Sequence, residues 1–240
     1  MAQRRAHTYS APRGSSPPLT RESAARLLPP GLETAAPLLE ALPGRLDRYL
    51  DMLLAWNRAM NLTGGRDRAD ILARLIPDSF HLAAFLGSAP LAEVPAMAAG
   101  PRVWDLGAGA GLPGIPLRMV WDTGNYTLVE AREKRALFLA NALATLELPR
   151  TTVFRGAAEA LFARMPHGAD IILSRAFLPW RKLLDFCLPG LAPGGVVIIL
   201  ASEASGEIPA PWRLAAETAY SVDGSPRWFW ALRPGEAAHA

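Results

Sequence analysis

The chain has 240 residues, half of them apolar, so it is long enough to bury a full hydrophobic core. This length suits one catalytic unit with an extension better than two equal domains. The formal net charge is +3, and nearly all of the basic residues are arginine, which binds phosphate through two parallel hydrogen bonds. The charge therefore permits an RNA partner without requiring one.

Cysteine and histidine usage excludes two classes of protein. Cys187 is the only cysteine, which rules out a disulfide framework, and the four histidines are scattered, so we expect no metal. Apolar runs stay far below the roughly 20 residues that cross a bilayer, and the start does not resemble a signal peptide. We expect a soluble, cytoplasmic protein with no membrane contact.

Residues 1–30 carry five arginines against a single acidic residue, Glu22, and include two pairs of adjacent prolines. They lack a sustained apolar period, which predicts a mobile basic arm over 1–30. A solvated tail is the simpler interpretation of such an arm, and contact with RNA phosphates is the alternative.

The next segment is predicted to be helical. Apolar residues recur at steps of three and four between 45 and 60, as on one face of a helix, and the turn-rich stretch 61–65 ends that helix. A second helical stretch covers 69–86 and must break near Pro77, which has no amide proton. Together these segments predict a helical cap over 31–98.

From residue 99 the pattern changes to short β-rich runs that alternate with helical ones. Such alternation is typical of a doubly wound parallel sheet. Two further strands, joined by a turn at 223–225, predict an antiparallel hairpin at the C-terminal edge. The predicted strands are 103–106, 126–130, 151–155, 170–174, 195–201, 214–222 and 227–232.

A glycine-rich turn follows the first of these strands. Gly107, Gly109 and Gly111 form the spacing G-x-G-x-G, and glycine lets the backbone approach a ligand closely. The dinucleotide fingerprint G-x-G-x-x-G would need a glycine where Leu112 stands, so S-adenosylmethionine (AdoMet) fits better than NAD. An ordinary tight turn is the alternative.

Two acidic residues flank this turn in the predicted sheet. Asp105, near the end of the first strand, resembles the acidic start of the first motif of class I methyltransferases, where it lies near the cofactor's amino-acid end. Glu130 closes the second strand, where a carboxylate can accept hydrogen bonds from both ribose hydroxyls. A surface glutamate is the alternative for Glu130.

The glycine turn continues into a longer string, D-x-G-x-G-x-G-L-P-G-I-P-L over 105–117, which resembles the hallmark of the RsmG/GidB family. Further matches occur in the family's order over about 45–201. They are Trp56-Asn57 with Asn61-Leu62-Thr63, Asp78-Ser79, Glu133-Lys134-Arg135, and Ser174-Arg175-Ala176-Phe177.

The resemblance implies a Rossmann-like class I methyltransferase with a mainly parallel seven-stranded sheet, a C-terminal hairpin and an N-terminal helical cap. It implies AdoMet as cofactor and methylation of a guanine at N7 in 16S rRNA of the small ribosomal subunit. Guanine N7 carries a lone pair and no proton, so the transfer needs positioning rather than a general base. We accordingly name no acid–base pair, and we expect a monomer.

The same resemblance assigns further site residues. Gly107, Leu112, the Ala157-Ala158 segment and Arg175 would contact the cofactor, although Arg175 could instead hold the substrate. A basic turn would contact RNA phosphate or would simply be an exposed face of a helix. It contains Arg132, Lys134 and Arg135.

Three positions depart from the family's pattern. Its histidine before the Asp-Ser pair is Leu75, its R-[AV]-E motif reads Gly156-Ala157-Ala158, and its lysine-glycine pair after the fifth strand reads Ala201-Ser202 with Glu203 beside it. A one-residue slip would let Arg155 and Glu159 replace the second motif. These departures keep two alternatives open: a relative that methylates another RNA or a small molecule, and a ribosome-binding protein without transfer activity. A nicotinamide oxidoreductase is a remote fourth interpretation.

Overall fold

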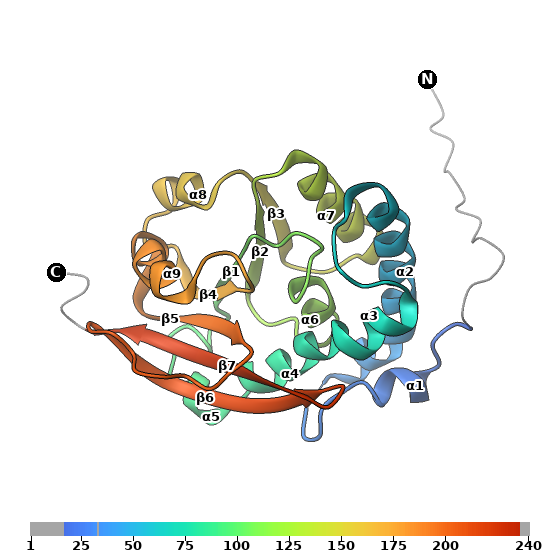
Figure 1. The fold of residues 1–240 in the computed structure, drawn as a ribbon, viewed down its shortest axis with the longest axis horizontal. Coiled ribbons are helices and arrows are strands. Elements are labelled where there is room, and N and C mark those ends of the chain that lie inside the picture. The colour runs from blue at the N-terminus through green and yellow to red at the C-terminus, as the bar shows by residue number, and fades with distance from the viewer. Residues whose placement is uncertain (1–16, 33, 236–240) are drawn as a thin grey trace.

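The computed structural model describes residues 17–32 and 34–235. A seven-stranded sheet runs through the molecule in the order β3-β2-β1-β4-β5-β7-β6 (Figure 1). The first five strands pair in parallel, and β7 runs antiparallel to both β5 and β6. The predicted mainly parallel sheet with a C-terminal hairpin is confirmed. The strands are β1 Arg102–Leu106, β2 Asn125–Glu130, β3 Thr151–Arg155, β4 Ala169–Ser174, β5 Leu191–Ala201, β6 Trp212–Val222 and β7 Ser225–Pro234.

Helices cover both faces of the sheet. Helices α8 and α9 lie on one face, and α6, α7 and the cap helices lie on the other (Figure 1). The helices are α1 Arg21–Ala25, α2 Ala36–Met60, α3 Arg68–Arg74, α4 Ile76–Leu86, α5 Ala89–Ala92, α6 Gly114–Val120, α7 Glu133–Leu146, α8 Ala158–Arg164 and α9 Trp180–Cys187, followed by the 3-10 turn Leu188–Gly190.

Alternate strand residues build two separate cores, because neighbouring side chains of a strand point to opposite faces. Val103 packs with the cap helices, whereas the adjacent Trp104 packs with α8 and α9. Strand β4 is buried along its whole length, as a central parallel strand with both faces covered must be.

The cap helices are longer than predicted but break where expected. Helix α2 begins at Ala36, nine residues before the predicted start, and contains Pro43. The apolar spacing that predicts this helix begins only at residue 45, after this proline. The second helical stretch separates into α3 and α4 at Leu75, and Pro77 occupies the first turn of α4, where its missing amide costs nothing.

Residues 1–16 of the expected basic arm lie outside the described residues. The described part, 17–30, contains α1, whose Thr20 and Ser23 form a reciprocal N-terminal cap. Its Ala24 is buried in the core between the cap helices and the sheet, which we call the main core. This part is therefore packed against the protein rather than a free arm. Cap residues and sheet residues share one core, so the cap belongs to the same folded unit. Among the described residues, no helix has the length and apolarity that a membrane span requires.

The sheet topology marks one edge as the place for a ligand. The chain moves outward from β1 to β3 and then returns to place β4 on the other side of β1. In open parallel sheets, ligands bind at the carboxyl ends of the strands beside such a reversal. The candidate site residues lie at the carboxyl ends of β1, β2, β3 and β4 or shortly after them.

Candidate cofactor and substrate site

The turn after β1 needs its glycines. Gly107, Gly109 and Gly111 have φ angles of 69°, 55° and 79°, a left-handed conformation that other residues adopt only at a cost. A Cβ on Gly107 would lie 2.7 Å from the ring of Phe177, and a Cβ on Gly111 would collide with Ile115. The turn is therefore fixed by backbone conformation as well as by packing.

Glu130, at the end of β2, organises this turn. Its carboxylate accepts hydrogen bonds from the backbone N–H of Gly109 at 3.0 Å and of Arg132 at 2.8 Å. The side chain is buried but still lines a pocket. Each carboxylate oxygen has a second lone pair, so Glu130 can also accept hydrogen bonds from a ligand hydroxyl.

Two pockets lie on either side of the glycine turn. The first, which we call the β2–β3 pocket, has a volume of about 400 Å³, within the usual range of roughly 300–1,000 Å³ for small-molecule sites. It is lined by Gly107, Val129, Glu130, Ala131, Arg132, Arg135, Gly156, Ala157, Ala158, Glu159, Ala176 and Phe177. The second, the cap pocket, has a volume of about 280 Å³ and is lined by Leu62, Thr63, Gly107, Ala108, Gly109, Ala110, Leu112, Arg135, Arg175 and Ala176.

Asp105 lies beneath the glycine turn rather than in either pocket. Its carboxylate accepts a hydrogen bond from the Tyr126 hydroxyl at 3.0 Å, and it is almost completely buried. Burial raises the pKa of Asp105 to about 7, although the Tyr126 hydrogen bond and the positive charge of Arg175 act in the opposite direction. Asp105 thus supports the turn from below.

The helical cap holds the other side of the turn. The Tyr49 hydroxyl, on α2, donates a 2.7 Å hydrogen bond to the carbonyl oxygen of Ala110. Asn57 accepts a hydrogen bond from the Thr63 N–H at 2.9 Å and donates one to the Gly65 carbonyl, which shapes the loop that reaches the cap pocket. The Asn57 and Asn61-Leu62-Thr63 motif was placed correctly in the cap, but its contact with the pocket was not predicted.

Arg175 follows β4 and lines the cap pocket. Its Nη2 lies 3.6 Å from the carboxylate of Asp78, on α4, while its Nη1 is buried with no hydrogen-bond partner in the described chain. Asp78 also accepts hydrogen bonds from Tyr220 at 3.0 Å and Arg227 at 2.5 Å, both on the C-terminal hairpin. A buried unpaired guanidinium N–H beside a pocket is suited to a ligand acceptor.

The structure shows where two of the three departures from the family pattern lie. Leu75 is half-buried against the main core. Arg155 forms an ion pair with Glu133 at 2.9 Å and does not line the β2–β3 pocket, whereas Glu159 does. The proposed slip therefore places Glu159, but not Arg155, at the site.

The predicted basic turn lies partly in the candidate cofactor site, which neither predicted role included. Arg135 lines both pockets and Arg132 lines the β2–β3 pocket. Lys134 is exposed and lines neither. RNA contact by these residues stays a prediction.

No group of three or more histidine, cysteine or acidic residues in the described part of the chain could hold a metal ion. The residues do fit AdoMet: a glycine cradle, an acidic residue at the end of β2 and a small-residue segment after β3 surround connected pockets of suitable size. This fold and site define a class I, AdoMet-dependent methyltransferase.

Comparison with known proteins gives the family. A family model described as rRNA small subunit methyltransferase G (GidB) matches residues 44–211. A relative named ribosomal RNA small subunit methyltransferase G from Nitratidesulfovibrio vulgaris is 52% identical over 205 residues, which covers 85% of this chain and 89% of the relative. One from Oleidesulfovibrio alaskensis is 44% identical, covering 79% and 84%.

The chain belongs to the RsmG/GidB family. A solved O-methyltransferase from Bacillus cereus shares the fold, with a TM-score of 0.51, 15% identity, and coverage of 78% of this chain and 90% of that one. The predicted family, fold class and AdoMet cofactor are confirmed.

Proposed function

We propose that the protein transfers a methyl group from AdoMet to N7 of a guanine in small-subunit (16S) rRNA. The observation that carries this proposal is the family match, which spans both the helical cap and the glycine turn that the cap contacts. The fold alone would indicate only a methyltransferase, because related folds act on many substrates.

Different site residues would contact different parts of the cofactor. Gly107, Gly109 and Leu112 would hold its amino-acid end in the cap pocket. Gly111, packed against Ile115, and Asp105 would support the turn without lining that pocket. Glu130 would accept hydrogen bonds from the ribose hydroxyls, and Ala157 with Ala158 would lie against the adenine. Glu159 lines the same pocket and would provide an acceptor there.

The reaction requires the methyl group and guanine N7 to be oriented toward each other, and it requires no proton transfer. When bound, AdoMet supplies an electrophilic methyl group on a sulfonium centre. Guanine N7 attacks through a lone pair, so no residue has to remove a proton. Arg175 would hold either the cofactor carboxylate or the RNA, since its buried Nη1 lacks a partner in the described chain.

We further propose that the cap (31–98) and the sheet domain (99–240) act as one monomeric unit in the cytoplasm, where ribosomes are found. The cap contributes Leu62 and Thr63 to the cap pocket, and the sheet domain contributes the other residues that line it. Lys134 would add an RNA phosphate contact on the exposed side of α7.

The test is a substrate profile with labelled AdoMet. Purified protein is incubated with small ribosomal subunits from a host that lacks this gene, with naked 16S rRNA and with transfer RNA, and the labelled nucleoside is identified by mass spectrometry. Label in N7-methylguanosine from the subunit or its rRNA supports the proposal.

Two other outcomes lead to the alternatives. Transfer to another RNA only, or to another atom, would identify a divergent methyltransferase. AdoMet binding with no transfer to any substrate would favour the ribosome-binding protein without activity.

A further inference from the structure

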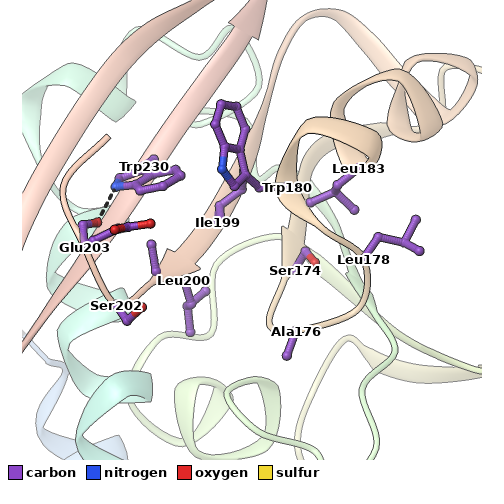
Figure 2. A pocket seen from close by; sticks show the side chains of 11 residues that line it. Ser174, Ala176, Leu178, Trp180, Leu183, Ile199, Leu200, Ser202, Glu203 and Trp230 are labelled. Atoms are coloured by element: carbon purple, nitrogen blue, oxygen red, sulfur yellow. Dashed lines mark hydrogen bonds between the residues drawn. The ribbon is translucent and has the colours of Figure 1, made fainter. Parts of the chain in front are cut away.

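A third pocket lies between the carboxyl ends of β4 and β5 and has a volume of about 230 Å³ (Figure 2). We call it the β4–β5 pocket. Ser174 is the last residue of β4 and Ala201 the last of β5, so the pocket opens at the same edge of the sheet as the cofactor site. It is lined by Ser174, Ala176, Leu178, Trp180, Leu183, Ile199, Leu200, Ala201, Ser202, Glu203 and Trp230.

Ala176 joins this pocket to the cofactor site, because it lines the β2–β3 pocket, the cap pocket and the β4–β5 pocket alike. Its φ angle is 54°, a left-handed conformation that is uncommon for a residue with a side chain and that occurs at functional sites. The cofactor residues follow β1, β2 and β3. The neighbouring space at the ends of β4 and β5 is therefore open to the methyl acceptor.

The lining suits a flat aromatic ring. Trp180, at the start of α9, meets Trp230 of β7 edge to face, with centroids 5.6 Å apart and planes at 86°. The Arg181 guanidinium lies over the Trp180 ring at 4.3 Å, and aliphatic side chains complete the walls. Proteins bind unstacked RNA bases in pockets of this kind, between aromatic and aliphatic side chains.

Glu203 is the charged residue in this lining (Figure 2). Its backbone is held in place, because the Trp230 indole N–H donates a 3.1 Å hydrogen bond to the Glu203 carbonyl oxygen. Its carboxylate is exposed and makes no hydrogen bond or ion pair with any residue that the structure describes. An unpaired carboxylate on an anchored backbone, at the rim of an apolar pocket, is suited to a ligand with N–H donors.

We propose that the β4–β5 pocket receives the target guanine and that Glu203 accepts hydrogen bonds from its N1–H and 2-amino groups. This inference rests on the proposed function. Guanine is the one RNA base with two adjacent N–H donors on its Watson–Crick edge, and these match the two oxygens of a carboxylate. N7 lies on the opposite edge of the purine, so holding the first edge leaves N7 free to face the cofactor site.

Charge favours this role over contact with the RNA backbone. A carboxylate repels phosphate, whereas its hydrogen bonds to N–H donors are stronger than those of a neutral acceptor. The lysine-glycine pair of the family is absent here: Ala201-Ser202 stands at its place, and the acidic Glu203 follows directly. Glu203 is thus a specificity-determining residue of this chain.

The first test compares Glu203→Gln with Glu207→Gln, a glutamine substitution in the same loop whose side chain does not line the pocket. Glutamine at 203 keeps one acceptor but turns an NH₂ group toward guanine donors, which opposes binding. Methyl transfer to small subunits should show kcat/KM reduced roughly 10- to 100-fold by Glu203→Gln and unchanged by Glu207→Gln. AdoMet affinity by calorimetry should be the same in all three proteins, which excludes a folding defect.

The second test does not depend on transfer. Binding of GMP, and of IMP, which lacks the 2-amino group, is followed by tryptophan fluorescence with S-adenosylhomocysteine bound. The wild type should bind GMP about tenfold more tightly than IMP, and Glu203→Gln should bind both equally. If the wild type methylates subunits but Glu203→Gln behaves like Glu207→Gln and GMP is not preferred, the pocket assignment is wrong. If GMP is preferred through Glu203 but no subunit is methylated, the assignment holds and the proposed rRNA substrate fails.

Discussion

Two buried acidic residues near the ends of neighbouring strands, Glu130 and Asp105, have different structural roles. Glu130 has both oxygens on backbone amides and still reaches the β2–β3 pocket, so it shapes the turn and can meet a ligand. Asp105 is buried below the turn and hydrogen-bonded to Tyr126, so it acts through the turn it supports. Both were predicted as cofactor contacts, Asp105 as the acidic start of the glycine motif and Glu130 as the last residue of its strand. The sequence alone did not distinguish the residue that lines a pocket from the residue that supports the turn.

Replacement of Asp105 by asparagine should change how stability depends on pH. Because the pKa of this acid is raised from 3.8 to about 7 in the folded state, the folded protein binds an extra proton between these values. The contribution of Asp105 to the free energy of unfolding therefore falls as pH rises from about 4 to 7, by on the order of 3 kcal/mol. Asparagine does not titrate, so the variant lacks this loss of stability. Denaturant unfolding at pH 4.5 and 7.5 should show that the free energy of unfolding of the variant, relative to that of the wild type, is higher at pH 7.5. An unchanged difference would contradict the raised pKa.

Arginine in place of Gly109 should abolish AdoMet binding. Gly109 has a φ of 55° and a Cβ there would lie 3.6 Å from the Arg135 guanidinium, so a long cationic side chain would strain the backbone and fill the cap pocket. Calorimetry should detect no binding, a loss of at least about 100-fold. The control is Gly44→Arg on the exposed side of α2, where a Cβ meets nothing within 4 Å. Equal affinity in Gly109→Arg would show that the cofactor lies elsewhere.

At the scale of elements, α2 does more than cover the sheet. Its buried residues Leu46, Tyr49, Leu50 and Leu53 follow a helical period, and this part was predicted correctly. The helical spacing of apolar residues does not predict the hydrogen bond from the Tyr49 hydroxyl to the Ala110 carbonyl, because these residues are 61 positions apart in the chain.

Phenylalanine at position 49 tests whether the cap holds the glycine turn. It leaves the Ala110 carbonyl buried without its donor, which should cost about 1–3 kcal/mol of unfolding free energy and weaken AdoMet binding severalfold. Leu50→Ala, in the same helix but away from the turn, should cost about 2–5 kcal/mol with little effect on affinity. Denaturant unfolding and calorimetry measure the two quantities. The coupling is refuted if Tyr49→Phe loses stability alone.

The β4–β5 pocket shows where prediction from the sequence ends. Its walls come from the start of α9, the end of β5 and the middle of β7, which only the folded sheet brings together. The strands, the glycine turn and the break at Leu75 follow from local patterns, so the sequence predicts them. The Asp78 contacts with Arg175 and the C-terminal hairpin depend on tertiary packing and could not be predicted.

For the whole molecule, the modest net charge of +3 implies that RNA binding depends on where the basic residues lie. Lys134 is exposed on α7, next to the cofactor site but outside both of its pockets, which makes it a clean probe of phosphate contact. Arg213 is exposed on β6, at the opposite edge of the sheet.

Alanine at position 134 should weaken binding to small subunits and lower its salt dependence. Loss of one phosphate contact reduces the slope of log affinity against log salt concentration by about 1. Affinities measured between roughly 50 and 200 mM KCl should show this reduction in Lys134→Ala and not in Arg213→Ala. Equal slopes would place the RNA on another face.

The central claim, methylation of guanine N7 in small-subunit rRNA, is tested most directly in ribosomes made in a host that lacks its own enzyme. The gene for this chain is introduced, and 16S rRNA is treated with borohydride and aniline, which cleave the strand at N7-methylguanosine. We predict one new cleavage site with the wild-type protein and none with the Gly109→Arg variant. No cleavage by the wild-type protein, or equal cleavage by both, would contradict the account.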